Sequence, residues 1–338
     1  MKPGLYTVEE VSAMIREGKK LLLAGNAALL SQLPKGDWIG GSTPYFILYP
    51  EQRVESFEKI FVHCLPDFVE TIEIREYDTL SIENIYVDAP QNGFTVLIIP
   101  FGCPLHWSFS LNVPDYKNFA RFPLCGWVAG QPIDIVMTEK SYIRSGLSDI
   151  SYSDKAVAMH ISLPANKYAE IHMYNSCEQG NGDIITFEHS GQIVSEAIVN
   201  GVKQSFADYL SSSTVDTEIT PLVANYAGAM IAAGCVNVIE GQVYMSTPVF
   251  EKIEYRFARE KENVPEPEMS DVVVFSATCA SIYMRPDVCK NLVKFVNGPA
   301  VFGEIAYQML NGSTLYVTIG DVPVNTEKET TQNTITVK

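Results

Sequence analysis

The chain has 338 residues, 46% of them hydrophobic and 11% aromatic, and this length and composition favour a large folded core over disorder. Asp and Glu outnumber Lys and Arg by 40 to 24, and the formal net charge of −16 argues against nucleic acid and anionic membranes as partners. The longest apolar runs have the length of strands, and no cationic segment followed by an apolar core opens the sequence. We therefore expect a cytoplasmic protein.

Seven cysteines are scattered along the chain without a Cys-x-x-Cys pair. An odd, scattered set predicts reduced and mostly buried thiols, and argues against a disulfide framework or a zinc site. The sequence also lacks the P-loop, the dinucleotide fingerprint and the nucleophile elbow, so no standard catalytic signature assigns an activity.

The N-terminal segment carries the signals of a helix, a strand and a second helix. Thr7 and Glu10 have the spacing of a capping box, and apolar residues then keep helical spacing as far as Gly18. Residues 20–24 predict a buried strand, and residues 26–33 predict a short helix capped by its first residue.

A glycine-rich turn is expected at Gly40–Pro44. Its free backbone N–H groups would lie beside two hydroxyls, which makes Gly41, Ser42 and Thr43 candidates for holding a ligand. A turn without any ligand accounts for the same residues.

The next part of the chain reads mainly as strands, which we expect at residues 45–49, 59–63, 81–87 and 95–99, with a strand or helix start at 68–73. The segment Gly102–Trp107 then places Cys103 and His106 three residues apart. Such a pair is a candidate for binding a metal, or for ligating haem iron through the Cys-Pro thiolate. Packing at a turn is the alternative, because two ligands are few for a metal site.

Another apolar strand is expected at Cys125–Gly130, and Ser, Gly and Asp residues then mark a loop at 143–155. We place the boundary between two lobes in this loop. The expected division is an N-terminal lobe at 1–150, a C-terminal lobe at 151–320 and a polar, disordered tail at 321–338.

Residues 156–163 and 168–174 predict a hairpin closed by the loop Pro164–Lys167. In this register Met159 faces His172, so that His160 points to the opposite face. A two-histidine metal site across the hairpin is therefore disfavoured.

The rest of the chain up to residue 297 reads as strands with few helices. We expect paired strands at 183–189 and 192–199, a helix through Phe206 and Leu210, a strand pair or buried helix at 221–235, strands at 243–250, 252–258 and 271–276, a charged loop at 259–268, and a helix at 287–295.

One carboxylate, Glu304, stands among apolar residues in the stretch Gly298–Ile319. A carboxylate in such a setting stays solvated, finds a partner or shifts its pKa, which makes Glu304 the first candidate for a functional site. Gly298 and Gly303 allow a ligand or another strand to approach the backbone closely. A tight turn before a strand, with Glu304 on its rim, is the alternative.

Three stretches of the sequence, Trp38–Pro44, Val272–Ala280 and Gly298–Ile319, resemble motifs of FIST sensory domains. They follow one another in the order in which that family has them. The chain looks most like an uncharacterised FIST-related bacterial family. It departs from that pattern at Gly41, where the family often has cysteine.

The resemblance implies a cytoplasmic sensory module that binds an amino acid or similar metabolite, without a cofactor, and signals to a separate protein. Glu304, beside Gly303, would pair with the ligand's amine, and the donors around Gly41, Ser42 and Thr43 would hold its carboxylate. The residues after Ile319 are too few for a kinase or cyclase, so the output would lie in a partner.

Two other function classes remain open. Some FIST proteins bind haem, and a haem-based gas sensor would use Cys103, His106 or another of the five histidines. A hydrolase or transferase would use Glu304 or Cys279, although the small neighbours of Cys279 favour an inert buried thiol.

Strand-like runs outnumber helices and do not alternate regularly with them, so we predict an α+β fold. Its expected form is two interleaved lobes of mixed or antiparallel sheet with outer helices. Ser42 and Glu304 are expected to lie close together in space.

Overall fold

The computed structural model describes residues 2–49, 52–175, 177–217, 220–261, 272–284 and 297–323. The predicted helix at 287–295, most of the predicted charged loop at 259–268 and almost all of the predicted tail lie outside these residues. The described chain is a β-rich α+β protein built from mixed and antiparallel sheets, as the sequence predicts.

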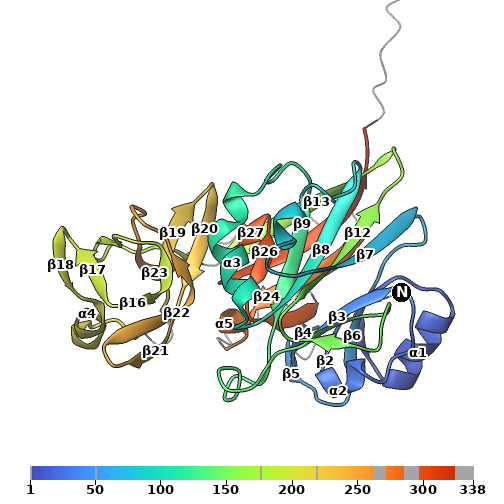
Figure 1. The fold of residues 1–338 in the computed structure, drawn as a ribbon, viewed down its shortest axis with the longest axis horizontal. Coiled ribbons are helices and arrows are strands. Elements are labelled where there is room, and N and C mark those ends of the chain that lie inside the picture. The colour runs from blue at the N-terminus through green and yellow to red at the C-terminus, as the bar shows by residue number, and fades with distance from the viewer. Residues whose placement is uncertain are drawn as a thin grey trace, which may run out of the picture.

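Three six-stranded sheets form the body of the molecule, on the right of Figure 1. The first sheet has the order β1 (Gly4–Tyr6), β6 (Ile60–Cys64), β2 (Leu21–Gly25), β3 (Trp38–Ser42), β10 (Ile143–Ser145) and β11 (Ser151–Tyr152). The central sheet has the order β27 (Gln308–Met309), β26 (Glu304–Ala306), β9 (Leu124–Ala129), β8 (Gly93–Pro100), β12 (Ala156–Ser162) and β7 (Thr71–Tyr77). The third sheet has the order β13 (Lys167–Asn175), β28 (Ser313–Asp321), β24 (Val272–Cys279), β25 (Gly298–Val301), β4 (Tyr45–Leu48) and β5 (Gln52–Glu55).

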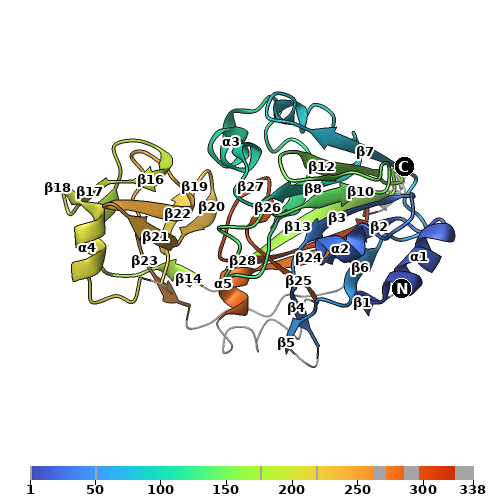
Figure 2. The same cartoon turned by 60° about the horizontal axis from the view of Figure 1, so that its bottom comes forward.

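A small lobe, residues 177–261, projects from one side of this body (Figures 1 and 2). Its four-stranded sheet has the order β14 (Cys177–Gln179), β23 (Arg256–Glu260), β19 (Leu222–Tyr226) and β20 (Ala229–Ala233). One three-stranded sheet has the order β15 (Ile185–Thr186), β17 (Glu196–Val199) and β18 (Val202–Ser205). The other has the order β16 (Gly191–Val194), β22 (Gln242–Val249) and β21 (Cys235–Ile239). The hairpin of β19 and β20 decides between the two predictions for residues 221–235 in favour of a strand pair.

The helices of the described chain are short and lie outside the sheets. They are α1 (Val8–Arg16), α2 (Ala27–Leu30), α3 (Pro104–Asn112), α4 (Phe206–Ser212) and α5 (Ala280–Tyr283), with 3-10 turns at Ile82–Asn84 and Val113–Asp115. None of these helices is long and apolar enough to cross a membrane. The predicted capping box opens α1, where Glu10 N donates to Thr7 Oγ1 (3.3 Å) and Thr7 N donates to Glu10 Oε2 (2.7 Å).

The main core lies where the central sheet packs against the other two sheets. Trp127 of β9 stacks on Phe275 of β24 with ring centroids 5.4 Å apart, and Phe46 of β4 stacks on Phe61 of β6 at 5.9 Å. The opposite face of the central sheet is covered by α3 and the first 3-10 turn, which close a second apolar cluster.

Several local predictions are wrong. The hairpin at 156–174 does not form, because β12 pairs with β7 and β8 whereas β13 pairs with β28 in another sheet. Residues 81–87 are not a strand but a 3-10 turn at Ile82–Asn84 followed by further turns, and Asp78 Oδ1 holds the start of this segment by accepting bonds from the N–H groups of Leu80 and Ser81. The Gly40–Pro44 stretch continues β3 as far as Ser42 before it turns.

Strand pairing crosses the predicted lobe boundary near residue 150. β8 pairs with β12, β9 pairs with β26, and β4 pairs with β25, so early and late segments share the same sheets. Within the described chain, the small lobe is the part whose sheets share no strand with the sheets of the body.

Candidate functional site

Glu304 lies in the layer between the central and third sheets. It faces Trp127 across the antiparallel pair of β26 and β9, and residues paired in this way project to the same side of a sheet. Trp127 reaches Phe275 of the third sheet, so Glu304 also points toward that sheet. The residue has no exposed surface, which excludes the alternative of a turn with Glu304 on its rim.

The Glu304 carboxyl has few polar partners for a buried acid. Ser313 Oγ donates to Oε2 at 3.5 Å, and the Cys279 thiol lies next to the carboxyl and stabilises its ionised form. Within the described part of the chain, Oε1 has no hydrogen-bond partner. Burial raises the pKa of Glu304 well above its usual range, and the contacts with Cys279 and Ser313 offset only part of this effect.

A second unpartnered acceptor lies beside Glu304. Asn311 Oδ1 is buried and has no partner in the described ranges, and a Cβ atom placed on Gly303 would lie 2.8 Å from it. Asn311 Nδ2 points the other way and donates to Ser246 Oγ of β22 at 3.5 Å. The site therefore sits at the joint between the body and the small lobe.

The glycine-Ser-Thr segment predicted to bind a carboxylate lies next to the Gly298–Glu304 stretch, as expected. Thr43 Oγ1 donates to the carbonyl of Ala300 at 2.8 Å, and Ser42 Oγ accepts from Tyr142 N at 3.0 Å. Both hydroxyls thus hold β3 to its neighbours. A Cβ atom on Gly41 would lie 3.0 Å from Trp127 Nε1, so glycine permits the close approach of Trp127.

Cys103 and His106 lie at the start of α3, in the second apolar cluster. The Cys103 thiol caps the helix by accepting from His106 N at 3.4 Å, and it donates to the carbonyl of Pro100 at 3.2 Å. His106 is fully buried and its ring lies 4.1 Å from that of Trp107. With its thiol used as a cap and a donor, Cys103 does not fit haem ligation as it stands, since a thiolate ligand would require the cap to open. Among the described residues no group of three or more His, Cys, Asp or Glu side chains has the arrangement of a metal site.

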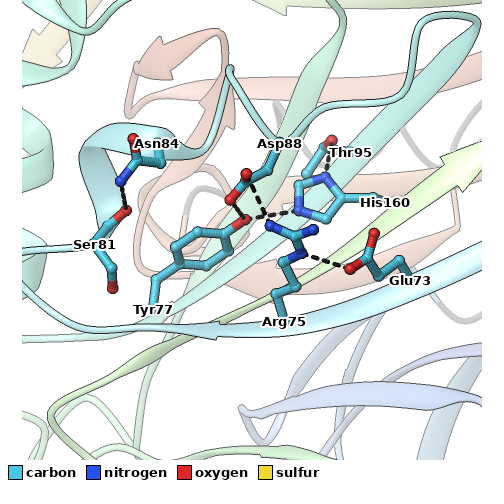
Figure 3. Close-up of polar contacts among 8 residues, drawn as sticks. All are labelled: Glu73, Arg75, Tyr77, Ser81, Asn84, Asp88, Thr95 and His160. Carbon is cyan, nitrogen blue, oxygen red and sulfur yellow. Dashed lines mark hydrogen bonds and ion pairs between the residues drawn. The ribbon is translucent and has the colours of Figure 1, made fainter.

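A polar chain on the other face of the central sheet was not found by sequence reasoning (Figure 3). Tyr77 OH donates to Asp88 Oδ2 (2.9 Å) and lies 2.8 Å from His160 Nε2, while His160 Nδ1 lies 2.8 Å from Thr95 Oγ1. The Tyr77 hydroxyl has a single proton, which it donates to Asp88, so its oxygen accepts a hydrogen bond from His160 Nε2. His160 Nδ1 then has no proton and accepts a hydrogen bond from the Thr95 hydroxyl. Arg75 closes the chain at the surface with an ion pair to Asp88 (2.8 Å). These hydrogen bonds hold the segment after β7 against the central sheet. In the sequence, only the alternation of Glu73, Arg75 and Tyr77 indicates such a polar network.

The fold and site thus define a β-rich α+β protein with a buried carboxyl-thiol pair beside the joint of its small lobe. The chain belongs to the DUF6976 family, a family of unknown function, whose model matches residues 6–320. No curated protein matches the chain.

The burial of Glu304 predicts an unusual dependence of stability on pH. The folded-state pKa lies above the unfolded value of 4.5, so the folded state binds the extra proton and the free energy of unfolding falls as pH rises from 4.5 toward 8. Glu304→Gln cannot ionise, and it should therefore gain about 1.4 kcal/mol over the wild type for each pH unit in this window. Urea unfolding of both proteins between pH 5 and pH 8 measures the difference. A constant difference would contradict a raised pKa at Glu304.

Proposed function

We propose that this protein is a cytoplasmic sensory module that binds an amino acid or a similar small metabolite at Glu304 and signals to a separate partner protein. The observation that carries the proposal is the pair of buried acceptors, Glu304 Oε1 and Asn311 Oδ1, that have no hydrogen-bond partner among the residues the structure describes. The two interleaved lobes of a FIST-type fold are part of the same proposal.

The chemistry of the two acceptors favours a ligand with an ammonium group. Each unpartnered buried polar group costs about 1–3 kcal/mol, and an ammonium group brings three N–H donors and a positive charge. A cation beside Glu304 would also stabilise the carboxylate that burial disfavours. A ligand amine therefore supplies both the hydrogen-bond donors for the two acceptors and the positive charge beside Glu304.

Binding at this site would be linked to the position of the small lobe. Glu304 has no exposed surface, so a ligand reaches it only when a covering segment moves, and in this proposal that segment is the neighbouring 307–312. That segment is held by the small lobe, because Gln308 Nε2 donates to the carbonyl of Tyr226 at 3.0 Å and Ala232 N donates to the carbonyl of Leu310 at 2.9 Å. The small lobe is thus the part of the described chain through which occupancy of the site would reach a partner.

The hydroxyls of Ser42 and Thr43 have a supporting role in this proposal. Thr43 fixes Ala300, four residues before Glu304, and Gly41 admits Trp127, the residue that faces Glu304. Their substitution would shift the site without removing a ligand contact.

We expect amino acids to raise the melting temperature of the wild type and to bind by titration calorimetry, whereas the matched carboxylic acids without an amine do not. Glu304→Gln should weaken this binding about 100-fold, the value of a lost charge-assisted hydrogen bond of about 2.7 kcal/mol. Glu240→Gln, at an exposed glutamate of the small lobe, is the matched control and should leave the affinity unchanged. Equal binding of alanine and propionate, or full affinity in Glu304→Gln, would contradict the proposal.

A further inference from the structure

The Cys279 thiol, at the junction of β24 and α5, is surrounded by groups that could serve a reaction. Ser281 Oγ donates to the sulfur at 3.0 Å, and the backbone amides of Gly312 and Ser281 also favour its thiolate form. Thr278 of β24 pairs with Thr314 of β28, which sets Cys279 opposite Ser313, and Ser313 Oγ donates to Glu304 Oε2 at 3.5 Å. The thiol thus lies next to the Glu304 carboxyl, whose Oε1 atom has no partner among the described residues. The sulfur therefore has donors to hold negative charge and an acceptor to receive its proton.

Cys125 shows how different an ordinary buried thiol of this protein is. It is fully buried in the main core, its thiol lies 3.5 Å from the carbonyl of Thr95, and burial alone raises its pKa. The combination at Cys279 of hydrogen-bond donors and a carboxyl group is thus more than a consequence of burial.

We propose that Cys279 is a thiol nucleophile and Glu304 its general base, acting on small esters or thioesters. The Glu304 carboxylate takes the proton of the thiol while the sulfur attacks the acyl carbon, and the carbonyl electrons move to its oxygen. When the carbonyl reforms, the leaving alcohol or thiol departs with the proton from Glu304. Water then attacks the acyl-cysteine, Glu304 accepts a proton from it, and the sulfur leaves and regains that proton. The net reaction is hydrolysis of the acyl compound to an acid and an alcohol or thiol.

The surroundings of the pair support these steps. Burial, followed by the charge of Glu304, raises the pKa of Cys279 to about 12, so attack requires a base that removes the proton during the reaction. The amides of Ser281 and Gly312 flank the sulfur, where they can donate to the oxygen of the tetrahedral intermediate. Cys279 is only 6% exposed, which limits the substrate to small acyl groups.

This inference goes beyond the proposed function, with which it shares Glu304 but not the ligand. Cys279→Ala separates the two, because it removes the nucleophile and leaves the Glu304 and Asn311 acceptors for an amino acid. Failure of acylation with intact amino-acid binding would overturn only the inference made here.

The test uses p-nitrophenyl acetate as the probe, with release of p-nitrophenolate followed by absorbance and the acetylated cysteine located by peptide mass spectrometry. We expect the wild type to be acetylated at Cys279 at a rate that rises between pH 6 and pH 9 as Glu304 ionises. Cys279→Ala should lose this reaction, and Glu304→Gln should slow it about 100-fold at pH 8. Glu304→Asp should recover part of the rate, which a merely structural role of Glu304 would not produce.

The control variant is Cys235→Ser, which removes a partly exposed thiol of β21 in the small lobe and should leave the Cys279 rate unchanged. Circular dichroism of each variant establishes that it is folded, and Ser281→Ala provides a milder change on the same sulfur, with an expected loss of about tenfold. Acetylation confined to other cysteines, or an equal rate in Glu304→Gln, would overturn the proposal.

Discussion

Gly126→Ala is expected to abolish the native state or to lower the free energy of unfolding by more than about 4 kcal/mol. A Cβ atom on Gly126 would lie 1.8 Å from the carbonyl oxygen of Leu97, far inside van der Waals contact, and the backbone has φ +153°. The obstacle is the backbone of β8, which cannot rotate away as a side chain can. Soluble yield and the urea midpoint measure the effect.

Gly182→Ala is the matched control for this substitution. A Cβ atom at Gly182 meets no atom within 4 Å, so the variant should unfold within about 0.5 kcal/mol of the wild type. A Gly126→Ala protein as stable as Gly182→Ala would show that β8 and β9 do not approach one another as closely as the structure has them.

The close approach at Gly126 also positions the candidate site. Gly126 pairs with Leu97 on one side and with Ile305 on the other, next to the pair of Trp127 and Glu304. The register of β26, which carries Glu304, is therefore set on β9 at the residue where β9 approaches β8 most closely. A shift here would move the carboxyl away from Cys279.

Features set by neighbouring residues could be predicted from the sequence. The capping box of Thr7 and Glu10, the Asn26 cap of α2 and the helix through Phe206 and Leu210 are all confirmed. Each depends on contacts within a few residues, so the sequence pattern contains the cause.

The pairing of strands could not be predicted in the same way. Residues 156–162 and 167–175 are both strands, as expected, yet a loop that would suit a hairpin joins strands of two different sheets. The partner of a strand is chosen by how distant apolar faces pack together, and hairpin patterns carry no information about that choice. The same limit explains why pairing crosses the predicted lobe boundary.

The candidate site was predicted in part. The apolar setting of Glu304 left open whether the carboxyl is solvated, paired or shifted in pKa, and the structure buries it with a raised pKa. The sequence suggested an inert Cys279 because no cation lies near it in the chain, whereas its partner in space is a carboxyl group from another sheet. Asn311 was noted only as part of a motif, since its unpartnered oxygen depends on the turn that places it beside Gly303.

Acidification should destabilise the protein strongly, because three histidines are buried in the neutral form. Burial lowers the pKa of His63 and of His106 to about 3 and that of His160 to about 4, all below the unfolded value of 6.5. The unfolded state therefore binds more protons as pH falls below 6.5, and the free energy of unfolding falls with it. At pH 4.5, two units lower, each histidine would remove between about 2 and 3 kcal/mol.

The three histidines together would remove about 8 kcal/mol at pH 4.5, which is comparable to the whole stability of an ordinary domain. Glu304 acts in the opposite sense over the same range, so the measurement is best made in the Glu304→Gln background. We expect urea unfolding there to show a steep loss of stability between pH 6.5 and pH 4.5.

The histidine of the polar chain gives the sharpest version of this experiment. His160 is surrounded by Tyr77, Thr95, Arg75, Asp88 and Glu73, and the cation of Arg75 adds to the effect of burial in keeping His160 neutral. His160→Gln should reduce the stability at pH 7, because the bonds to Tyr77 and Thr95 are disturbed, and should also reduce its dependence on pH by about one proton. His189→Gln, at an exposed histidine, should change neither quantity. If the free energy of unfolding of His160→Gln depended on pH as steeply as that of the wild type, His160 would be able to take up a proton in the folded protein. The hydrogen bonds among Thr95, His160, Tyr77 and Asp88 would then have to rearrange to accommodate the charge.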